Sequence, residues 1–136
     1  MIRFTPRMRD LAARIIAFEM RANGSSGAAI PVAFTVCEKL RPQWANLMGA
    51  TGFRTLLSRA LKMAGAKVPW LSAVQVRADG SLEAMEKMDA PIAPDKMAAG
   101  SVVLIAELLG LLEGFIGETL AMRLMQDVWP ELPPPP

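Results

Sequence analysis

The chain has 136 residues, 52% of them hydrophobic, and a formal net charge of +2. It contains no histidine, no tyrosine and one cysteine, Cys37, so an internal disulfide and every catalytic or metal site that uses histidine are excluded. The length fits one domain, and ten Met against five Phe and three Trp favour helix packing. We expect a mainly α-helical single domain, in the cytoplasm because nothing indicates a disulfide-stabilised secreted protein, and with neither cofactor nor metal.

The charge is divided along the chain. Residues 1–77 contain twelve Lys or Arg and three acids, a net charge of +9, whereas residues 78–136 contain three bases and ten acids, a net charge of −7. The basic half can be neutralised by the acidic half, by a second copy of the chain, or by a polyanion. These three alternatives predict different functions.

The first predicted helix begins at Thr5 and Pro6, because threonine can cap the first amides and proline fits the first helical position. Apolar residues then recur every three or four positions as far as Ala22. On the polar side, Asp10 and Arg14 are four residues apart and are expected to pair. The segment at residues 23–27, rich in Gly and Ser, is expected to end this helix.

The next helical region is predicted in three pieces. A helix from Ile30 to Leu40 is expected to be interrupted at Pro42, because the residue before proline avoids the α conformation. A short turn then ends at Gly49, and residues 49–52 are expected to form a loose turn. The third piece, Phe53 to Ala64, is an amphipathic helix with a basic polar face.

A β-hairpin is predicted from about Ser72 to Met85. Val74 and Val76 alternate with polar residues, and the Asp79-Gly80 pair is a strong hairpin-turn signal. A two-stranded hairpin is marginal alone in water, so it must pack on the helices or pair with another sheet edge.

The last helix is predicted to run from Pro94 or Asp95 to about Val128, after a polar connector from Met85 to Asp95. The sequence therefore predicts one helical domain over residues 1–130 and a disordered, proline-rich tail over residues 131–136.

Small residues and carboxylates share faces of this long, mostly apolar helix. Three glycines in one helix would be costly unless they allow close backbone contact. The helix is therefore expected to mediate self-association, through the following residues: Ala106, Gly110, Glu113, Gly114, Gly117 and Glu118. Its glutamates, Glu107 included, either pair with arginines of the basic half (Arg14, Arg21, Arg54 or Arg59) or lie on a solvated edge.

Nucleic-acid binding is an alternative function. Residues 43–62 resemble a helix-turn-helix motif, although Thr55 occupies a position where an apolar contact is expected. The residues that could contact phosphates and bases are Arg54, Thr55, Ser58, Arg59 and Lys62. The other interpretation is an ordinary helical hairpin with a solvated basic face.

A membrane-active helix is the third alternative. The segment from Met97 to Met125 is apolar, but Glu107, Glu113 and Glu118 interrupt it, which disfavours a membrane span. Catalysis is not expected: no phosphate-binding loop is present, and Cys37 lies on the apolar face of its predicted helix, as a core residue would.

Three runs resemble an uncharacterised bacterial protein family. They are Gly52 to Leu61 (GFRTLLSRAL), Val68 to Leu71 (VPWL) and Phe115 to Leu124 (FIGETLAMRL). The resemblance spans most of the chain, and it implies no activity and no site residues.

Taken together, the apolar last helix and the divided charge predict a non-enzymatic interaction or regulatory protein that forms a homo-oligomer or binds a protein partner.

Overall fold

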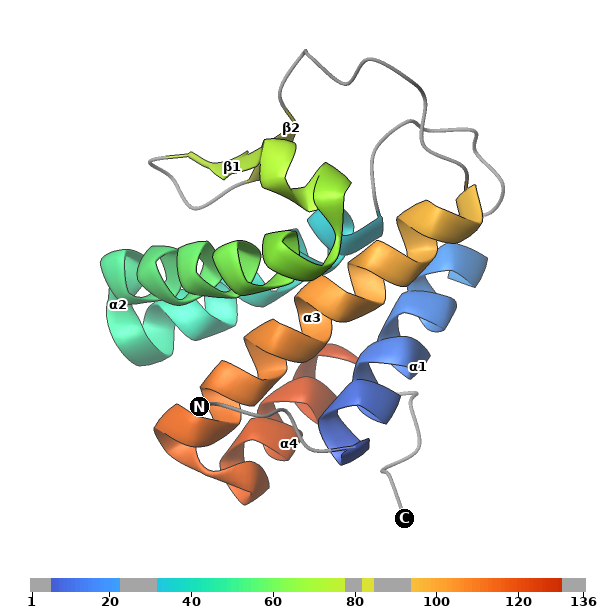
Figure 1. Cartoon of the computed structure of the whole chain (residues 1–136). Helices are drawn as coiled ribbons and strands as arrows, with labels where there is room; N and C mark the ends of the chain where they lie inside the picture. Colours follow the sequence, from blue (N-terminus) through green and yellow to red (C-terminus); the bar gives the residue numbers. More distant parts are fainter. Residues whose placement is uncertain (1–5, 23–31, 78–81, 85–93, 131–136) are drawn as a thin grey trace.

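Four α-helices and a two-stranded hairpin form the computed structural model, which describes residues 6–22, 32–77, 82–84 and 94–130. The longest apolar helix, α3 (Pro94–Ile116), crosses the middle of the molecule with α1 on one side and α2 on the other (Figure 1). The prediction of a mainly α-helical single domain with one hairpin is confirmed. The predicted loop at residues 23–27 and the proline-rich tail lie outside the described residues.

Helix α1 (Pro6–Ala22) has the predicted bounds. The predicted ion pair is present, with 3.0 Å between Arg14 Nε and Asp10 Oδ2. The opposite face is buried, and its apolar members are Leu11, Ala12, Ile15 and Ile16. The 3.6-residue period of the sequence therefore gave both the helix and the face that packs on the core.

Helix α2 (Val32–Lys67) continues through Pro42, so the predicted interruption there is wrong. A proline inside a helix costs about 3 kcal/mol in local terms, because it removes a hydrogen bond and its ring crowds the preceding turn. Pro42 is exposed, and so is Glu38, the residue whose carbonyl loses its helical hydrogen bond. Leu40 and Trp44, on either side of it, are fully buried. Tertiary packing therefore outweighs the local preference.

The real break in α2 is at Gly49, which has φ 83° and ψ 158°. This region of backbone space is essentially limited to glycine, and one such residue turns the chain sharply. Across the bend, the rings of Trp44 and Phe53 meet edge to face with 6.0 Å between their centroids, and both are buried. The predicted end of a helical piece at Gly49 is therefore confirmed, but the expected loose turn over residues 49–52 is wrong, because residues 50–52 are already helical.

The hairpin follows a short 3₁₀ helix, η1 (Pro69–Ala73). Strand β1 (Val74–Val76) pairs antiparallel with β2 (Leu82–Ala84), with Gln75 opposite Glu83, which confirms the predicted hairpin. The Asp79-Gly80 turn itself lies outside the described residues. Val74 is buried, Gln75 exposed and Val76 half-buried, and the strand packs on α2. The helix gives the hairpin the support that it would lack alone in water.

The predicted last helix begins and ends as expected, but it is two helices. Gly117, with φ 88° and ψ 160°, separates α3 from α4 (Glu118–Val128) and accepts the first α4 backbone bond, 3.1 Å from Ala121 N to Gly117 O. Helix α4 turns back toward the other helices (Figure 1). It ends at Trp129, which is 2% exposed. The predicted continuous helix is therefore corrected at Gly117, where the chain leaves the helical conformation.

The apolar character of α3 is used inside the fold. Every residue from 104 to 112 is buried, because α1 and α2 cover the helix. The segment Asp95–Ile116 is long and apolar enough to cross a membrane by length and composition alone, but 61% of its most apolar window is buried within the protein. Packing against α1 and α2 accounts for most of this hydrophobicity.

Candidate interaction surfaces

The residues predicted to form one interaction face of the last helix separate into two groups. Ala106 and Gly110 are buried in the domain's own core and are inaccessible to a second copy. The other members lie around the α3–α4 junction and are half-buried or exposed: Glu113, Gly114, Gly117 and Glu118. Only the second group is available to a partner, because the core already uses the first.

The close backbone contact predicted at these glycines is not found at Gly114 or Gly117 among the described residues. A Cβ atom added at either position would meet nothing within 4 Å. Such a contact occurs instead at Gly100, near the start of α3, where an added Cβ would lie 2.5 Å from the Trp70 ring. Gly100 therefore lets the indole of η1 lie against α3, a long-range contact that helical periodicity does not indicate.

The buried glutamate of α3 pairs with a lysine and not with one of the predicted arginines. Glu107 is 2% exposed, and Lys67 Nζ donates to its Oε1 at 2.6 Å. Lys67 is the last residue of α2, where the helix passes α3, so its long side chain can reach the carboxylate while remaining 54% exposed. This bond joins the basic half of the chain to the acidic half.

A second buried carboxylate, Glu19, was missed in the sequence. It is 0% exposed, and its Oε2 accepts hydrogen bonds from Lys39 Nζ at 2.6 Å and Trp129 Nε1 at 2.8 Å. The signal was present, because Glu19 follows Leu11 and Ile15 at intervals of four on the apolar face of α1. This network ties α1, α2 and the end of α4 together, which identifies it as structural.

The junction of α3 and α4 is a surface rich in exposed apolar side chains, here called the α3–α4 corner and defined by Gly114, Phe115, Gly117, Glu118 and Leu120. Phe115 is 64% exposed and Leu120 39%. A Cβ atom added at Gly114 or Gly117 would have no described atom within 4 Å, apart from the neighbouring residues and the helix's own backbone. Another backbone can therefore approach the aromatic ring closely.

The predicted basic face of α2 is accessible. Arg54 is half-buried, and the other four residues of this face are exposed: Thr55, Ser58, Arg59 and Lys62. The Thr55 hydroxyl donates to Thr51 O at 2.9 Å and so bonds to its own helix. Arg59 and Lys62 have no ion pair within the described part of the chain. Two cations are therefore available to an acidic partner.

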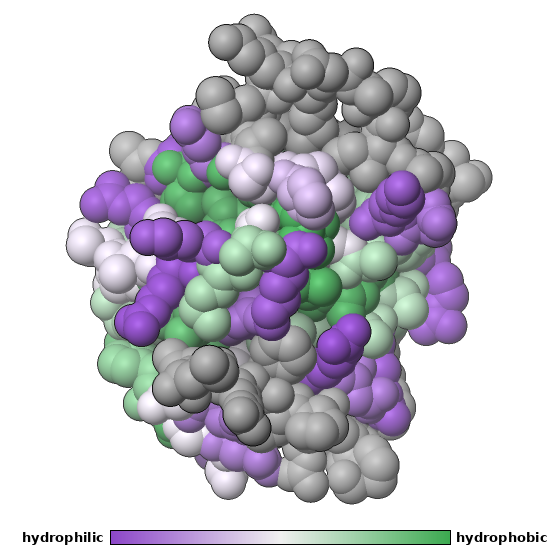
Figure 2. Space-filling view, viewed as in Figure 1, coloured by the Kyte–Doolittle hydropathy of each residue, from purple (hydrophilic) through white to green (hydrophobic). Residues whose placement is uncertain are grey.

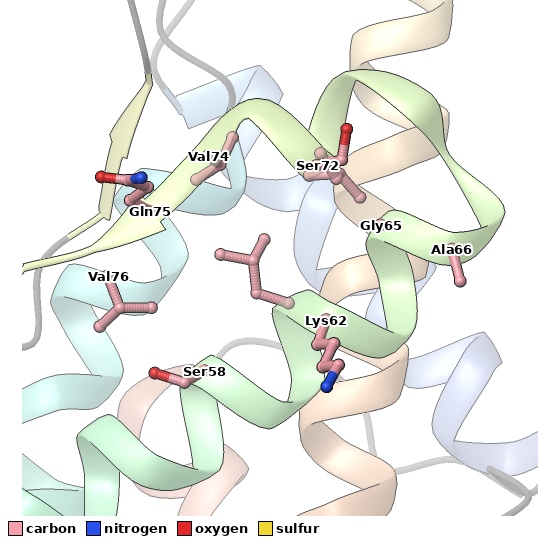
Figure 3. A pocket seen from close by; sticks show the side chains of 10 residues that line it. Ser58, Lys62, Gly65, Ala66, Ser72, Val74, Gln75 and Val76 are labelled. Atoms are coloured by element: carbon pink, nitrogen blue, oxygen red, sulfur yellow. The ribbon is translucent and has the colours of Figure 1, made fainter.

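A groove of about 620 Å³ lies between the second half of α2 and the hairpin (Figure 3). Val74 and Val76 extend from β1 toward α2, and Ser58 and Lys62 line the helix side. Hydrophobic surface is visible between the hairpin and α2 in Figure 2, bordered by hydrophilic side chains. The groove therefore combines an apolar floor with a basic margin. Sequence patterns could not find it, because it forms between separate elements.

Cys37 is not available as a nucleophile, and the described ranges contain no metal site. Cys37 is buried, and burial, with a smaller contribution from the Glu38 carboxylate, raises the pKa of its thiol to about 12. At neutral pH the thiol is protonated and inaccessible. No group of three or more Cys, Asp or Glu side chains among residues 6–22, 32–77, 82–84 and 94–130 could hold a metal ion.

Comparison with protein-family models, with curated proteins and with solved structures finds no match for this chain. The exposed corner, the groove and the basic face are the features from which function can be inferred.

Proposed function

We propose that this protein is a non-enzymatic interaction protein that self-associates through the α3–α4 corner. The observation that carries the proposal is the exposure of Phe115, which at 64% is higher than that of the other exposed large apolar side chains in the described residues, with Leu120 also exposed at the same junction. Complete burial of a Phe side chain stabilises by about 1.5–3 kcal/mol. A partner that covers Phe115 would therefore gain free energy of binding from this corner.

The corner has the composition of the centre of a protein interface. An aromatic anchor is the residue type most often responsible for binding energy, and it is most effective where a partner packs around it. Gly114 and Gly117 carry no side chains that would keep a partner away from the ring. These glycines, predicted to allow close contact, support a contact between chains instead of within one.

Sedimentation velocity over a concentration series tests the proposal. We expect a reversible oligomer at micromolar concentration. Phe115→Ser should raise the protein concentration at which half of the chains are associated by about tenfold or more, because apolar burial is lost. Met20→Ser is the matched control, since Met20 is also exposed, 44%, but lies on α1. A monomer throughout the series, or equal effects of the two substitutions, would reject the proposal.

The exposed basic face of α2 supports a second candidate, a DNA-binding regulator. Arg59 and Lys62 are accessible on one helix, as phosphate contacts require. Against this, one residue, Gly49, separates the two helical segments, whereas helix-turn-helix motifs have turns of about three or four residues. Titration with random-sequence duplex at several salt concentrations tests it. Each phosphate contact should contribute about −0.9 to the log–log slope, so a slope near zero excludes it.

A further inference from the structure

We infer that the groove between α2 and β1 receives the α3–α4 corner of a second copy of the chain, so that self-association is head-to-tail. This inference rests on the proposed function, and it adds the partner surface and the symmetry of the contact. The two surfaces belong to different parts of one molecule, with the hairpin and the α3–α4 corner at opposite ends in Figure 1. One chain therefore cannot fill its own groove with its own corner in this fold.

The groove has the size and the floor that an aromatic anchor requires. Its volume of about 620 Å³ can hold more than one side chain, since small-molecule pockets of about 300–1,000 Å³ accommodate larger groups. Leu61, Leu71 and Val74 line it and are already buried, so their apolar atoms form the floor. Phe115 and Leu120 of a second copy would complete this apolar surface.

Charge complementarity selects the corner as the occupant. Lys62 lines the groove, and Arg59 lies on the same helix; both are exposed and unpaired among the described residues. The corner carries the exposed carboxylate of Glu118 and lies in the acidic half of the chain. Opposite charges at the margin of an apolar contact steer association and fix its register.

The same charges disfavour a symmetric contact between two corners. A two-fold contact would bring Glu118 of one copy near Glu118 of the other, with Glu113 close by in both. Like charges across an interface are unfavourable. A head-to-tail contact avoids this repulsion, and it produces either a closed ring or an open chain of subunits.

Site-specific cross-linking tests the inference. The buried Cys37 thiol is unreactive in the folded protein, so single cysteines can be introduced without removing it. Ser58→Cys marks the groove, Thr119→Cys lies between the corner residues Glu118 and Leu120, and Met20→Cys marks a control position on α1; all three side chains are exposed. Differently tagged variants are mixed in pairs and treated with a short bismaleimide, while sedimentation records the mass. We expect a Ser58→Cys to Thr119→Cys product and none from Met20→Cys with Thr119→Cys.

The other outcomes separate the two proposals. Products from Thr119→Cys chains alone, in an associating protein, would overturn the head-to-tail contact and leave self-association standing. Products that join Thr119→Cys equally to Ser58→Cys and Met20→Cys would also overturn it. A monomeric protein without products would overturn both proposals.

Charge reversal provides an independent measurement. Lys62→Glu or Glu118→Lys should each weaken association about tenfold, and the double variant should restore most of it, because the opposite charges then meet again. Arg123→Glu, an exposed reversal on α4 outside the defined corner, is the control and should have a smaller effect. If the double variant associates no more tightly than the single variant with the weaker association, the inference is overturned.

Discussion

Lys67 and Glu107 connect the oppositely charged halves of the chain through a 2.6 Å contact between Nζ and Oε1. The carboxylate is 2% exposed, whereas the lysine is 54% exposed. A buried carboxylate is unfavourable unless it is paired, so Lys67 makes the position of Glu107 on the inner face of α3 tolerable. The acidic half thus neutralises part of the basic half within one molecule.

Removal of Lys67 should therefore destabilise the fold. Lys67→Met should lower the free energy of unfolding by about 1–3 kcal/mol, because it leaves the Glu107 carboxylate buried without its lysine. Urea denaturation measures the change. The control is Asp10→Asn, which breaks the exposed Asp10–Arg14 pair and should cost at most about 1 kcal/mol. Equal effects of the two substitutions would contradict the assigned role of Lys67.

Trp129 should stabilise the fold through its hydrogen bond to Glu19 as well as through its size. Trp129→Phe removes both the donor and part of the ring, whereas Trp44→Phe removes only ring volume, because Trp44 Nε1 has no hydrogen-bond partner in the described part of the chain. Both indoles are almost fully buried. We expect Trp129→Phe to cost about 1–2 kcal/mol more than Trp44→Phe in chemical denaturation. Equal costs would show that the Glu19 bond contributes nothing net.

Gly114 and Gly117 should respond in opposite directions to alanine. Gly114 is helical with open space around it, so Gly114→Ala should stabilise the chain by about 0.5–1 kcal/mol through helix propensity. Gly117 has φ 88°, so Gly117→Ala should destabilise it by about 1–3 kcal/mol. Thermal melting at one low protein concentration measures both without a large contribution from association. Two shifts of the same sign would contradict the break assigned to Gly117.

Cys37 should make the stability depend on alkaline pH. The pKa of its thiol is raised from 9.0 to about 12 in the folded chain, chiefly by burial. Between these values the unfolded state loses the proton while the folded state retains it. The stability present below pH 9 is therefore lost as pH rises toward 12, by about 1.4 kcal/mol per pH unit relative to Cys37→Ala. Denaturation of both proteins from pH 8 to pH 10 measures the difference, and parallel profiles would contradict it.

Local patterns predicted the elements of this fold well. The bounds of α1, the pairing of β1 with β2, and the two ends of the α3–α4 region could all be read from spacing, proline positions and one Asp-Gly pair. These signals depend only on residues a few positions apart, so they can be read from the sequence without knowledge of the fold. Pro42 is the instructive failure, because buried neighbours on either side keep the helix intact where the local rule predicts a break.

The candidate site was only partly predictable. The charge division and the glycines near residues 110–117 directed attention to the end of α3, but Phe115 was not recognised as the exposed anchor. Whether Gly110 faces the core and Gly114 faces water depends on which side of α3 the helices α1 and α2 cover. The groove likewise exists only because the hairpin lies across α2.

The sequence by itself determined which regions are mainly helical, which strands pair, and that basic and acidic residues occupy different halves. Tertiary structure alone decided that Lys67 reaches Glu107, that Glu19 holds Trp129, and that the chain turns at Gly117 but stays helical at Pro42. The physical reason is range. Helix periodicity is set by neighbours three or four residues apart, whereas the choice of ionic partner and of exposed face depends on which surfaces the whole chain brings into contact.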